Sequence, residues 1–525
     1  MVKCSWHETK SRGDNLRNTA PILFLVWAAC LAQANPQFTA SELAGKGSQW
    51  FTCDLDGDGL KDLVLIDGLT LSLFYQGPAS AFAREPQQTY QLEHRCCIVW
   101  PAKLDRPGGS LLVMASDGVS ELYFTSRISA PLVRRIIAQP TIIPDSVDET
   151  NVVYLSLSVE TGPTTVSPAP PGTAPASSSG PPLLLVPTPD GLQVWSSHTP
   201  ATRDGQAPGE WRQAQVIERA VDSRVRPSVI DPGYSRALDL NLTVGDINGD
   251  GRDDLILRRT LLGETNLYTS YLQQTNGLFN LEPALVFVDK AEPRSWLCWV
   301  DLNHDGKADL IKSTWLHEPS FVPGHPSGKV LVRAYLADAR GRISTEPNQI
   351  FRKNDWTPAL PVVDIDGDGF LDLALGSSPL DTREGVRKEI TARQLDYSLR
   401  FYFYRPGDGF PKEADSQRDV VIHLDQATLL LGWDRRQYFE HYVKLGGDFN
   451  GDGKTDLVVR DRGNDISVYF FISREKGFSP EPDLRFNCPE PFDEWEAEDL
   501  NHDGISDLIV KMAKQDSFRI FISHK

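Results

Sequence analysis

One nine-residue acidic motif occurs six times in this chain and constrains its fold more than any other feature. The copies begin at Asp54, Asp246, Asp301, Asp364, Asp448 and Asp499. Each has Asp at positions 1, 5 and 9, Asp or Asn at position 3, and Gly at position 6. Leu follows every copy and opens an apolar run, so each motif is expected to lead into a β-strand. A motif that recurs with this spacing predicts a repeat fold that presents the same loop in each unit.

The motif has the oxygen-bearing side chains that a calcium loop requires. Calcium takes six to eight oxygen ligands, which short loops supply from positions 1, 3 and 5 and from a backbone carbonyl at position 7. Here Asp at position 9 would close the site. We therefore expect up to about six calcium ions, with these ligands, position 7 contributing only its carbonyl: Asp54, Asp56, Asp58, Leu60, Asp62; Asp246, Asn248, Asp250, Arg252, Asp254; Asp301, Asn303, Asp305, Lys307, Asp309; Asp364, Asp366, Asp368, Phe370, Asp372; Asp448, Asn450, Asp452, Lys454, Asp456; Asp499, Asn501, Asp503, Ile505, Asp507.

Turn formation alone is the competing interpretation, because Asn, Asp and Gly favour tight turns without any metal. Turn chemistry does not require four oxygen-bearing side chains at fixed spacing in six places, so we favour calcium. Two copies carry a histidine at position 4, His304 and His502. We expect both to be exposed loop residues, because imidazole suits softer metals than calcium.

The charge of the chain fits bound cations and excludes one class of partner. The formal net charge is −18 at pH 7, and the acidic loops contribute strongly to it. A nucleic-acid-binding protein is expected to have a basic face. We therefore expect no nucleic acid as a partner.

The N-terminal segment resembles a secretion signal. A polar, basic stretch is followed by an apolar run over residues 20–32, and Ala32-Gln-Ala34 forms a small-x-small cleavage site. We expect residues 1–34 to be a signal peptide and the protein to be secreted, or held at the cell surface or in the periplasm. The alternative is a lipoprotein anchored through Cys30. No later segment is long and apolar enough to span a membrane.

The remaining chain reads as a ring of β-strand units. Strand pairs that resemble those after the acidic loops also occur at 111–124 and 183–195, without the loop. The units then begin near residues 54, 104, 182, 246, 301, 364, 448 and 499. This period predicts an all-β fold, a seven- or eight-bladed β-propeller of four-stranded blades over residues 35–525 with calcium-binding loops. Strands from 37–53 would complete the last blade and close the ring.

Several segments interrupt the repeat. The Pro-, Ser- and Thr-rich stretch 160–182 cannot bury a core and is predicted to be a disordered insertion. Longer inserts are expected at 315–329, 377–394 and 417–438, where a ligand-binding face would be sought. Trp50, Trp296, Trp299 and Trp495 recur just before acidic loops, which favours packing between blades over sugar stacking.

Two strings carry a family resemblance: Leu445-Gly-Gly-Asp-Phe-Asn-Gly-Asp-Gly453 and Val244-Gly-Asp-Ile-Asn-Gly-Asp-Gly251. They resemble the FG-GAP or VCBS repeat family, which includes the head of the integrin α-subunit and exported bacterial propellers. The resemblance implies a seven- or eight-bladed propeller with calcium in loops between blade strands, serving adhesion, glycan binding or protein contacts. The units at 104 and 182 depart from the family pattern, which places calcium there in doubt.

The sequence contains no catalytic fingerprint for a hydrolase, a nucleotide-binding enzyme or a zinc protease. The acidic pairs Asp493/Glu494 and Glu496/Glu498 are interpreted as solvated carboxylates. We therefore expect a binding protein, not an enzyme, with an extracellular glycan or protein as its ligand and a monomeric state. The alternative is a calcium-dependent polysaccharide lyase or hydrolase on a propeller scaffold.

Overall fold

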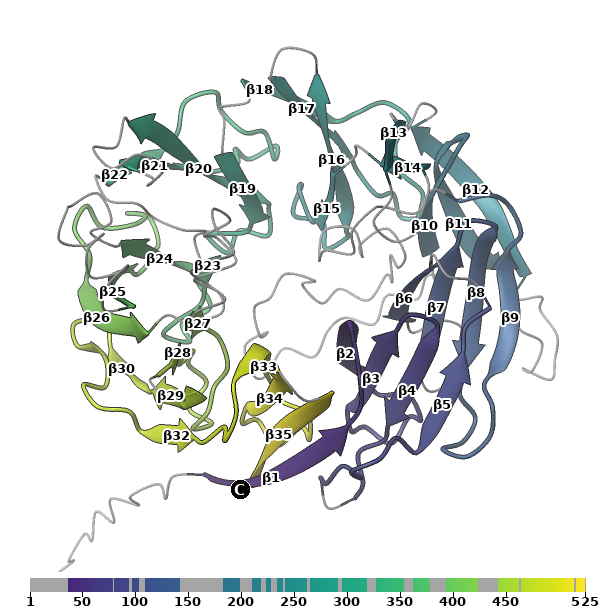
Figure 1. Cartoon of the computed structure of the whole chain (residues 1–525). Coiled ribbons are helices and arrows are strands. Elements are labelled where there is room, and N and C mark those ends of the chain that lie inside the picture. The colour runs from purple at the N-terminus through teal and green to yellow at the C-terminus, as the bar shows by residue number, and fades with distance from the viewer. Residues whose placement is uncertain are drawn as a thin grey trace, which may run out of the picture. The chain divides into compact units, whose positions relative to one another are not determined.

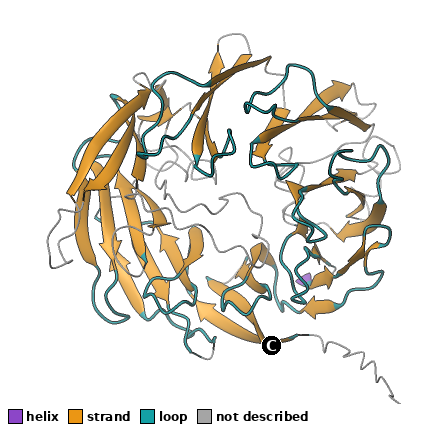
Figure 2. Ribbon diagram, turned by 180° about the vertical axis from the view of Figure 1, so that it is seen from behind, coloured by secondary structure: helices purple, strands orange, loops and turns teal. Residues whose placement is uncertain are grey.

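The computed structural model of the chain describes residues 36–78, 80–93, 97–102, 109–141, 183–198, 210–218, 223–227, 234–238, 241–261, 265–290, 295–318, 327–353, 362–377, 393–423, 442–461, 464–513 and 516–524. The predicted signal peptide with Cys30 and the predicted insertion 160–182 lie outside these ranges. Within them, no helix has the length and apolar character needed to cross a membrane. The described chain is all-β, as predicted, and its sheets are antiparallel (Figures 1 and 2).

The first four blades follow one another along the chain. Blade 1 is β2 (Gln49–Cys53), β3 (Asp62–Asp67), β4 (Thr70–Phe74) and β5 (Gln88–Gln91). Blade 2 is β6 (Cys97–Ala102), β7 (Ser110–Ala115), β8 (Gly118–Tyr123) and β9 (Leu132–Ile137). Blade 3 has three described strands, β10 (Leu183–Thr188), β11 (Gly191–His198) and β12 (Glu210–Glu218). Blade 4 is β15 (Asn241–Gly245), β16 (Asp254–Leu261), β17 (Thr265–Tyr271) and β18 (Leu285–Lys290).

The other four blades repeat the same order. Blade 5 is β19 (Ser295–Val300), β20 (Asp309–Glu318), β21 (Ser327–Tyr335) and β22 (Gln349–Lys353). Blade 6 is β23 (Val362–Val363), β24 (Asp372–Ser377), β25 (Gln394–Tyr402) and β26 (Ser416–His423). Blade 7 is β27 (Val443–Leu445), β28 (Leu457–Arg460), β29 (Ile466–Tyr469) and β32 (Leu484–Phe486). Blade 8 is β33 (Phe492–Glu498), β34 (Asp507–Met512), β35 (Ser517–His524) and β1 (Gln37–Ala44).

Two short two-stranded sheets accompany the blades among the described residues. One pairs β13 (Ser223–Pro227) with β14 (Tyr234–Leu238). The other pairs β30 (Phe471–Ser473) with β31 (Gly477–Phe478) and belongs to the turn region of blade 7. The count of eight blades decides between the two predicted numbers.

The blades form a ring because each one buries both of its faces. Side chains alternate along a strand, so in β3 Leu63 and Leu65 pack toward blade 8 while Val64 and Ile66 pack toward blade 2. The buried side chains fall into eight clusters, and each cluster joins one pair of neighbouring blades, the pair of blades 8 and 1 included. Eight interfaces between eight blades close the ring (Figure 1).

The N-terminal strand closes the last blade, as predicted. β1 pairs with β35 along its whole length, from Gln37 opposite His524 to Ala44 opposite Ser517. The prediction was too generous in one respect, because residues 49–53 form β2 of blade 1 instead of a second strand of blade 8. One strand suffices because three C-terminal strands already form the rest of that sheet.

Two predicted inserts are partly wrong. Residues 417–423 belong to β26, an outer strand in which Gln417 and Asp419 are exposed while Val420 and Ile422 are buried. Residues 315–318 extend β20 and residues 327–329 begin β21. The predicted packing role of the tryptophans is confirmed for Trp299 and Trp495, which are 6% and 1% exposed, and Trp50 packs against a buried cluster.

Candidate metal loops

The six acidic loops occupy one structural position in consecutive blades. Each joins the first and second strands of its blade, in blades 4, 5, 6, 7, 8 and 1, which are neighbours around the ring. Blades 2 and 3 lack the motif, as the sequence predicts. Four of the five neighbouring loop pairs are hydrogen-bonded through their backbones, for example from Lys61 N to Leu500 O at 2.9 Å and from Ser506 N to Asp448 O at 2.7 Å, and the side chain of His304 joins the fifth pair. The loops therefore form a connected arc.

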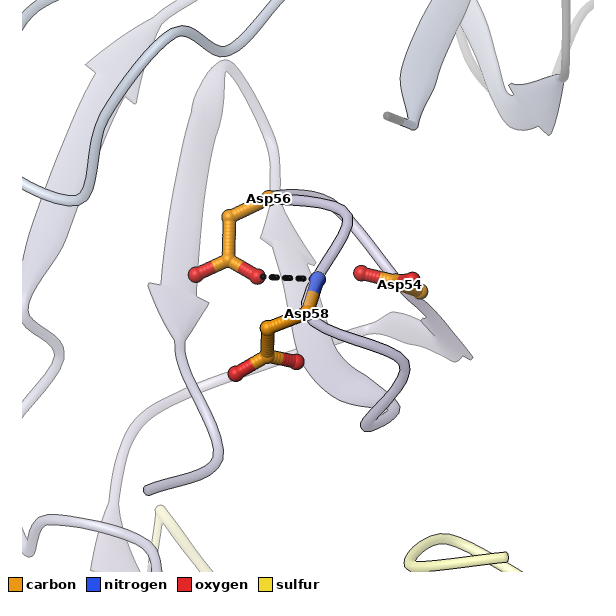
Figure 3. Close-up of side chains that lie close together, drawn as sticks. All are labelled: Asp54, Asp56 and Asp58. Atoms are coloured by element: carbon orange, nitrogen blue, oxygen red, sulfur yellow. Dashed lines mark hydrogen bonds between the residues drawn. The ribbon is translucent and has the colours of Figure 1, made fainter. Parts of the chain in front are cut away.

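Each loop is wound around the carboxylate at position 1. In the first loop Asp54 Oδ1 accepts from Gly57 N at 2.7 Å and Oδ2 accepts from Gly59 N at 3.0 Å. The position-6 amide donates to the position-1 carboxylate in all six loops. Figure 3 shows the carboxylates of Asp54, Asp56 and Asp58 around this turn, with the backbone N–H of Asp58 donating to Asp56.

The backbone at position 4 explains the two histidines. Gly57 has φ of 79° at this position, in the left-handed region that glycine adopts without steric cost. His304 and His502 adopt φ of 55° and 58° at the same place. Both histidines are exposed, as predicted, and His304 Nδ1 lies 2.9 Å from Gly369 O of the next loop. Both histidines continue the turn, and His304 also continues the contact between loops.

The position-9 carboxylate connects each loop to its blade. In all six loops this Asp is fully buried. Asp372 Oδ2 accepts from Ile365 N at 3.0 Å within the loop, and Oδ1 accepts from Tyr404 N at 2.9 Å at the end of β25. The other five follow the same pattern. The sequence did not predict this bracing role, which leaves Oδ2 of each carboxylate a second lone pair for a cation.

Burial makes these carboxylates difficult to ionise without a cation nearby. Desolvation raises the pKa of Asp62, Asp254 and Asp309 to about 7, against the opposing effect of two backbone N–H donors. It raises the pKa of Asp372 and Asp456 to about 8, and that of Asp507 to about 6. A bound divalent ion would favour their charged form.

Two loops bring three carboxylates together. Ligand oxygens of Asp54, Asp56 and Asp58 lie within 4.8 Å of one another, as do those of Asp364, Asp366 and Asp372. In the other four loops position 3 is Asn, whose amide oxygen replaces a carboxylate. The role of the six carbonyl groups at position 7 stays a prediction.

Two buried carboxylate oxygens support a fit to calcium. Asp366 Oδ1 and Asp499 Oδ1 are inaccessible to solvent and accept no hydrogen bond. An unsatisfied buried carboxylate oxygen is costly. A hard cation that takes oxygen ligands would satisfy both atoms, so the donor set fits calcium.

Two of the position-5 carboxylates have a cationic partner from the neighbouring blade that sequence reasoning missed. Arg127, from the β8–β9 turn of blade 2, contacts Asp56 and Asp58 in the loop of blade 1. Arg474, from the β30–β31 turn of blade 7, contacts Asp366 and Asp368 in the loop of blade 6. A sequence signal exists, because Phe-x-Ser-Arg occurs at 124–127 and again at 471–474.

A groove of about 720 Å³ lies beside the loop of blade 5. Its lining includes Asn303 from that loop and the polar residues Asp338, Arg342, Glu346 and Asn348. Arg342 Nη2 lies 2.7 Å from Asp338 Oδ2, and these two side chains are well exposed. The groove can therefore offer several hydrogen-bond donors and acceptors to a ligand.

Comparison with known proteins matches two stretches of the chain to a family model and finds similar solved structures. A family model described as an FG-GAP-like repeat matches residues 246–311 and 448–510. An Agrocybe aegerita lectin, described as recognising non-reducing terminal N-acetylglucosamine, is similar over 72% of this chain and 86% of its own, with 12% identity and a TM-score of 0.39. Sqt1 of Saccharomyces cerevisiae is similar over 92% of this chain and 100% of its own, with 10% identity and a TM-score of 0.40.

BBS1N, solved in complex with ARL6DN, is similar over 93% of this chain and 97% of its own, with 10% identity and a TM-score of 0.35. At these identities and TM-scores, none of the three structures says anything of this chain's ligand. The matched repeats and the ring of eight blades are independent observations that agree. The chain thus carries FG-GAP-like repeats in blades 4 and 5 and in blades 7 and 8 of an eight-bladed β-propeller.

Proposed function

We propose that this protein is a secreted, calcium-binding β-propeller that acts as an extracellular binding or adhesion module for a glycan or a protein. One observation supports it above others: six consecutive blades present the same acidic loop at the same place. The buried, unsatisfied oxygen of Asp366 gives calcium a specific task in one of these loops. Secretion rests on the signal-like segment 1–34.

Calcium would act here as scaffold and not as a reagent. Extracellular calcium modules bind with dissociation constants of about 0.1–1 mM. At about 1 mM free calcium each site then adds roughly 0.4–1.4 kcal/mol to the free energy of unfolding. Six such sites would add roughly 2.5–8.5 kcal/mol, a large fraction of an ordinary domain's stability of about 5–15 kcal/mol.

The groove beside the blade-5 loop is the ligand surface that we propose. Planar charged and amide side chains such as Arg342, Glu346 and Asn348 can form paired hydrogen bonds with neighbouring hydroxyl groups. A hydroxyl-rich glycan therefore suits the groove better than an apolar ligand. Asn303 belongs both to the groove and to a metal loop, so calcium would help to fix one wall.

A glycan array tests the proposal, run once with calcium and once with EGTA. We expect calcium-dependent binding that the double variant Arg342→Ala/Glu346→Ala abolishes. Arg352→Ala is the matched control, because Arg352 is exposed on outer strand β22 and does not line the groove. Equal binding by the double variant would reject this surface. Binding of a protein but of no glycan would select the other ligand class, and release of sugar products would favour the lyase or hydrolase alternative.

A further inference from the structure

The metal loop of blade 6 receives a cation from its neighbour. The Arg474 side chain crosses from blade 7, and its Nε and Nη2 atoms donate to Asp366 Oδ2 and Asp368 Oδ2. The guanidinium group lies over the buried ring of Phe403, 5.6 Å from its centroid. A planar guanidinium suits two carboxylates at once and remains charged at all relevant pH values. The guanidinium group, called the arginine fork below, therefore binds the carboxylates at positions 3 and 5 of the loop at the same time.

The same arrangement recurs between blades 2 and 1. Arg127 of blade 2 donates from Nε to Asp56 Oδ2 and from Nη2 to Asp58 Oδ2, the latter at 2.6 Å. Its guanidinium lies 5.4 Å from the centroid of the Tyr75 ring, the residue that corresponds to Phe403. Ser126 and Ser473 precede the two arginines, and each Oγ accepts from the backbone N–H three residues later. Two copies of one geometry indicate a built feature.

The arginine forks occur in the two loops that carry Asp at position 3. Where position 3 is Asn, its side-chain amide can donate a hydrogen bond to the position-5 carboxylate, as Asn248 Nδ2 does to Asp250 Oδ2 at 3.0 Å. Three of the four Asn loops also carry a basic residue at position 7 that contacts position 5: Arg252, Lys307 and Lys454. In the fourth Asn loop, Ser523 Oγ donates to Asp503. The two four-carboxylate loops have Leu60 and Phe370 at position 7, so their cation comes from the next blade.

We propose that Arg127 and Arg474 are built-in counter-cations, which hold these two loops closed in the absence of metal and lower their affinity for calcium. This inference rests on the proposed calcium role of the loops. In the metal-free protein each arginine offsets the repulsion between position-3 and position-5 carboxylates. Bound calcium neutralises the same carboxylates, so the arginine then stabilises the loop less.

Thermodynamic linkage fixes the sign of the effect. A group that stabilises the metal-free form more than the calcium form must weaken calcium binding. Removing it tightens calcium binding and destabilises the metal-free loop. A purely structural ion pair between blades would instead stabilise both forms equally. A positioning group that only preorganised the ligands would strengthen calcium binding.

The test compares Arg474→Gln and Arg127→Gln with Arg340→Gln as the matched control. Arg340 is exposed in the corresponding turn of blade 5, beside the Asn loop at 246–254. That turn lies close to the loop, because a Cβ at Gly341 would lie 2.4 Å from Ile247 O. Hydrogen-exchange mass spectrometry in EGTA and in calcium reports loop opening, and a calcium titration reports affinity.

We expect faster exchange of residues 364–372 in Arg474→Gln in EGTA, with a much smaller difference in calcium. At this one site, calcium should bind about fivefold to tenfold tighter, the scale of one unit charge roughly 6–9 Å from a divalent ion in water. Arg127→Gln should show the same faster exchange and tighter calcium binding at residues 54–62, and Arg340→Gln should show neither effect. Equal acceleration of hydrogen exchange in EGTA and in calcium, or weaker calcium binding by the arginine variants, would overturn the proposal.

A compensating variant separates this inference from the calcium proposal itself. Asp366→Asn restores an amide donor at position 3, so Arg474→Gln should have little further effect on exchange in that background. Failure of Asp366→Asn to reduce the effect of Arg474→Gln would overturn the counter-cation role. If the titration detects no calcium at all, the proposed calcium role fails, and exchange in EGTA still tests whether the arginines hold the loops closed.

Discussion

Trp50 of the first blade donates from its indole nitrogen to Glu494 of the last blade, with an Nε1–Oε2 distance of 3.0 Å. Beside it, Lys61 Nζ lies 2.7 Å from Glu498 Oε1, and Thr52 donates to the same carboxylate. The first and last blades are thus joined by polar contacts as well as by β1. Acidic residues that resemble a catalytic pair in the sequence here connect blades across the closure of the ring.

Glu498→Ala should therefore weaken the closure. Losing one charge-assisted hydrogen bond and one hydroxyl contact at a partly exposed carboxylate should lower the free energy of unfolding by about 1–2 kcal/mol. Chemical denaturation measures this change. The matched control is Glu481→Ala, whose side chain is exposed in blade 7. An unchanged midpoint for Glu498→Ala would show that apolar packing and β1 alone close the ring.

Substitution of a buried position-9 carboxylate should lower the free energy of unfolding more than substitution of an exposed carboxylate. Asp372→Ala removes the acceptor for Ile365 N and Tyr404 N, and leaving two backbone donors unsatisfied should cost about 2–6 kcal/mol. Asp372→Asn keeps one acceptor oxygen and should cost less. Denaturation in EGTA removes any contribution of calcium. Asp408→Ala, in an exposed turn of blade 6, is the control; an equally small effect of Asp372→Ala would contradict the bracing role.

The metal-free protein should lose stability as the pH rises. Burial raises the pKa of Asp62 to about 7 and that of Asp372 to about 8, above the value of about 3.9 in an unfolded chain. The folded state therefore holds protons that the unfolded state has released, and the stability this contributes is fully present below about pH 4. It is lost progressively as the pH rises from about 4 through the folded pKa values, and the decline ends at about pH 8.

Melting temperatures from pH 5 to 8.5 in EGTA check this prediction. Saturating calcium should flatten the decline, because the ions bind the ionised carboxylates and become more effective as the pH rises. A melting temperature in EGTA that rises across this range would contradict the assignment of buried, proton-holding carboxylates.

Much of the fold could be predicted from the sequence because the repeat is local. The nine-residue motif followed by Leu placed a loop before a strand in six blades, and alternating apolar residues placed strands in the two blades that lack it. The blade number stayed open because unit lengths vary. The polar run Gln417 to Asp419 favours an insert in the sequence, whereas in β26 the exposed Gln417 and Asp419 alternate with residues turned toward the blade.

The site was predictable only within one loop. Spacing indicated the candidate ligands, but the burial of Asp372 depends on the strands packed around it. The contacts of Arg127 and Arg474 depend on which blades are neighbours, and the ion pair of Arg474 with Asp366 spans 108 positions in the sequence. No local pattern encodes such a contact. The repeated Phe-x-Ser-Arg string becomes informative once the ring aligns it with the loops.

Calcium stoichiometry is the measurement that tests the central claim most directly. Equilibrium dialysis of the purified, EGTA-treated chain against calcium should reach up to about six ions per chain, and each loop disabled by substitution of its position-1 and position-5 Asp residues should remove one. The loops that begin at Asp246, Asp301 and Asp448 should be substituted one at a time, and each variant should bind one calcium ion fewer than the unmodified chain. A chain that binds no calcium at millimolar concentration, or whose stoichiometry is unchanged by these substitutions, would contradict the account.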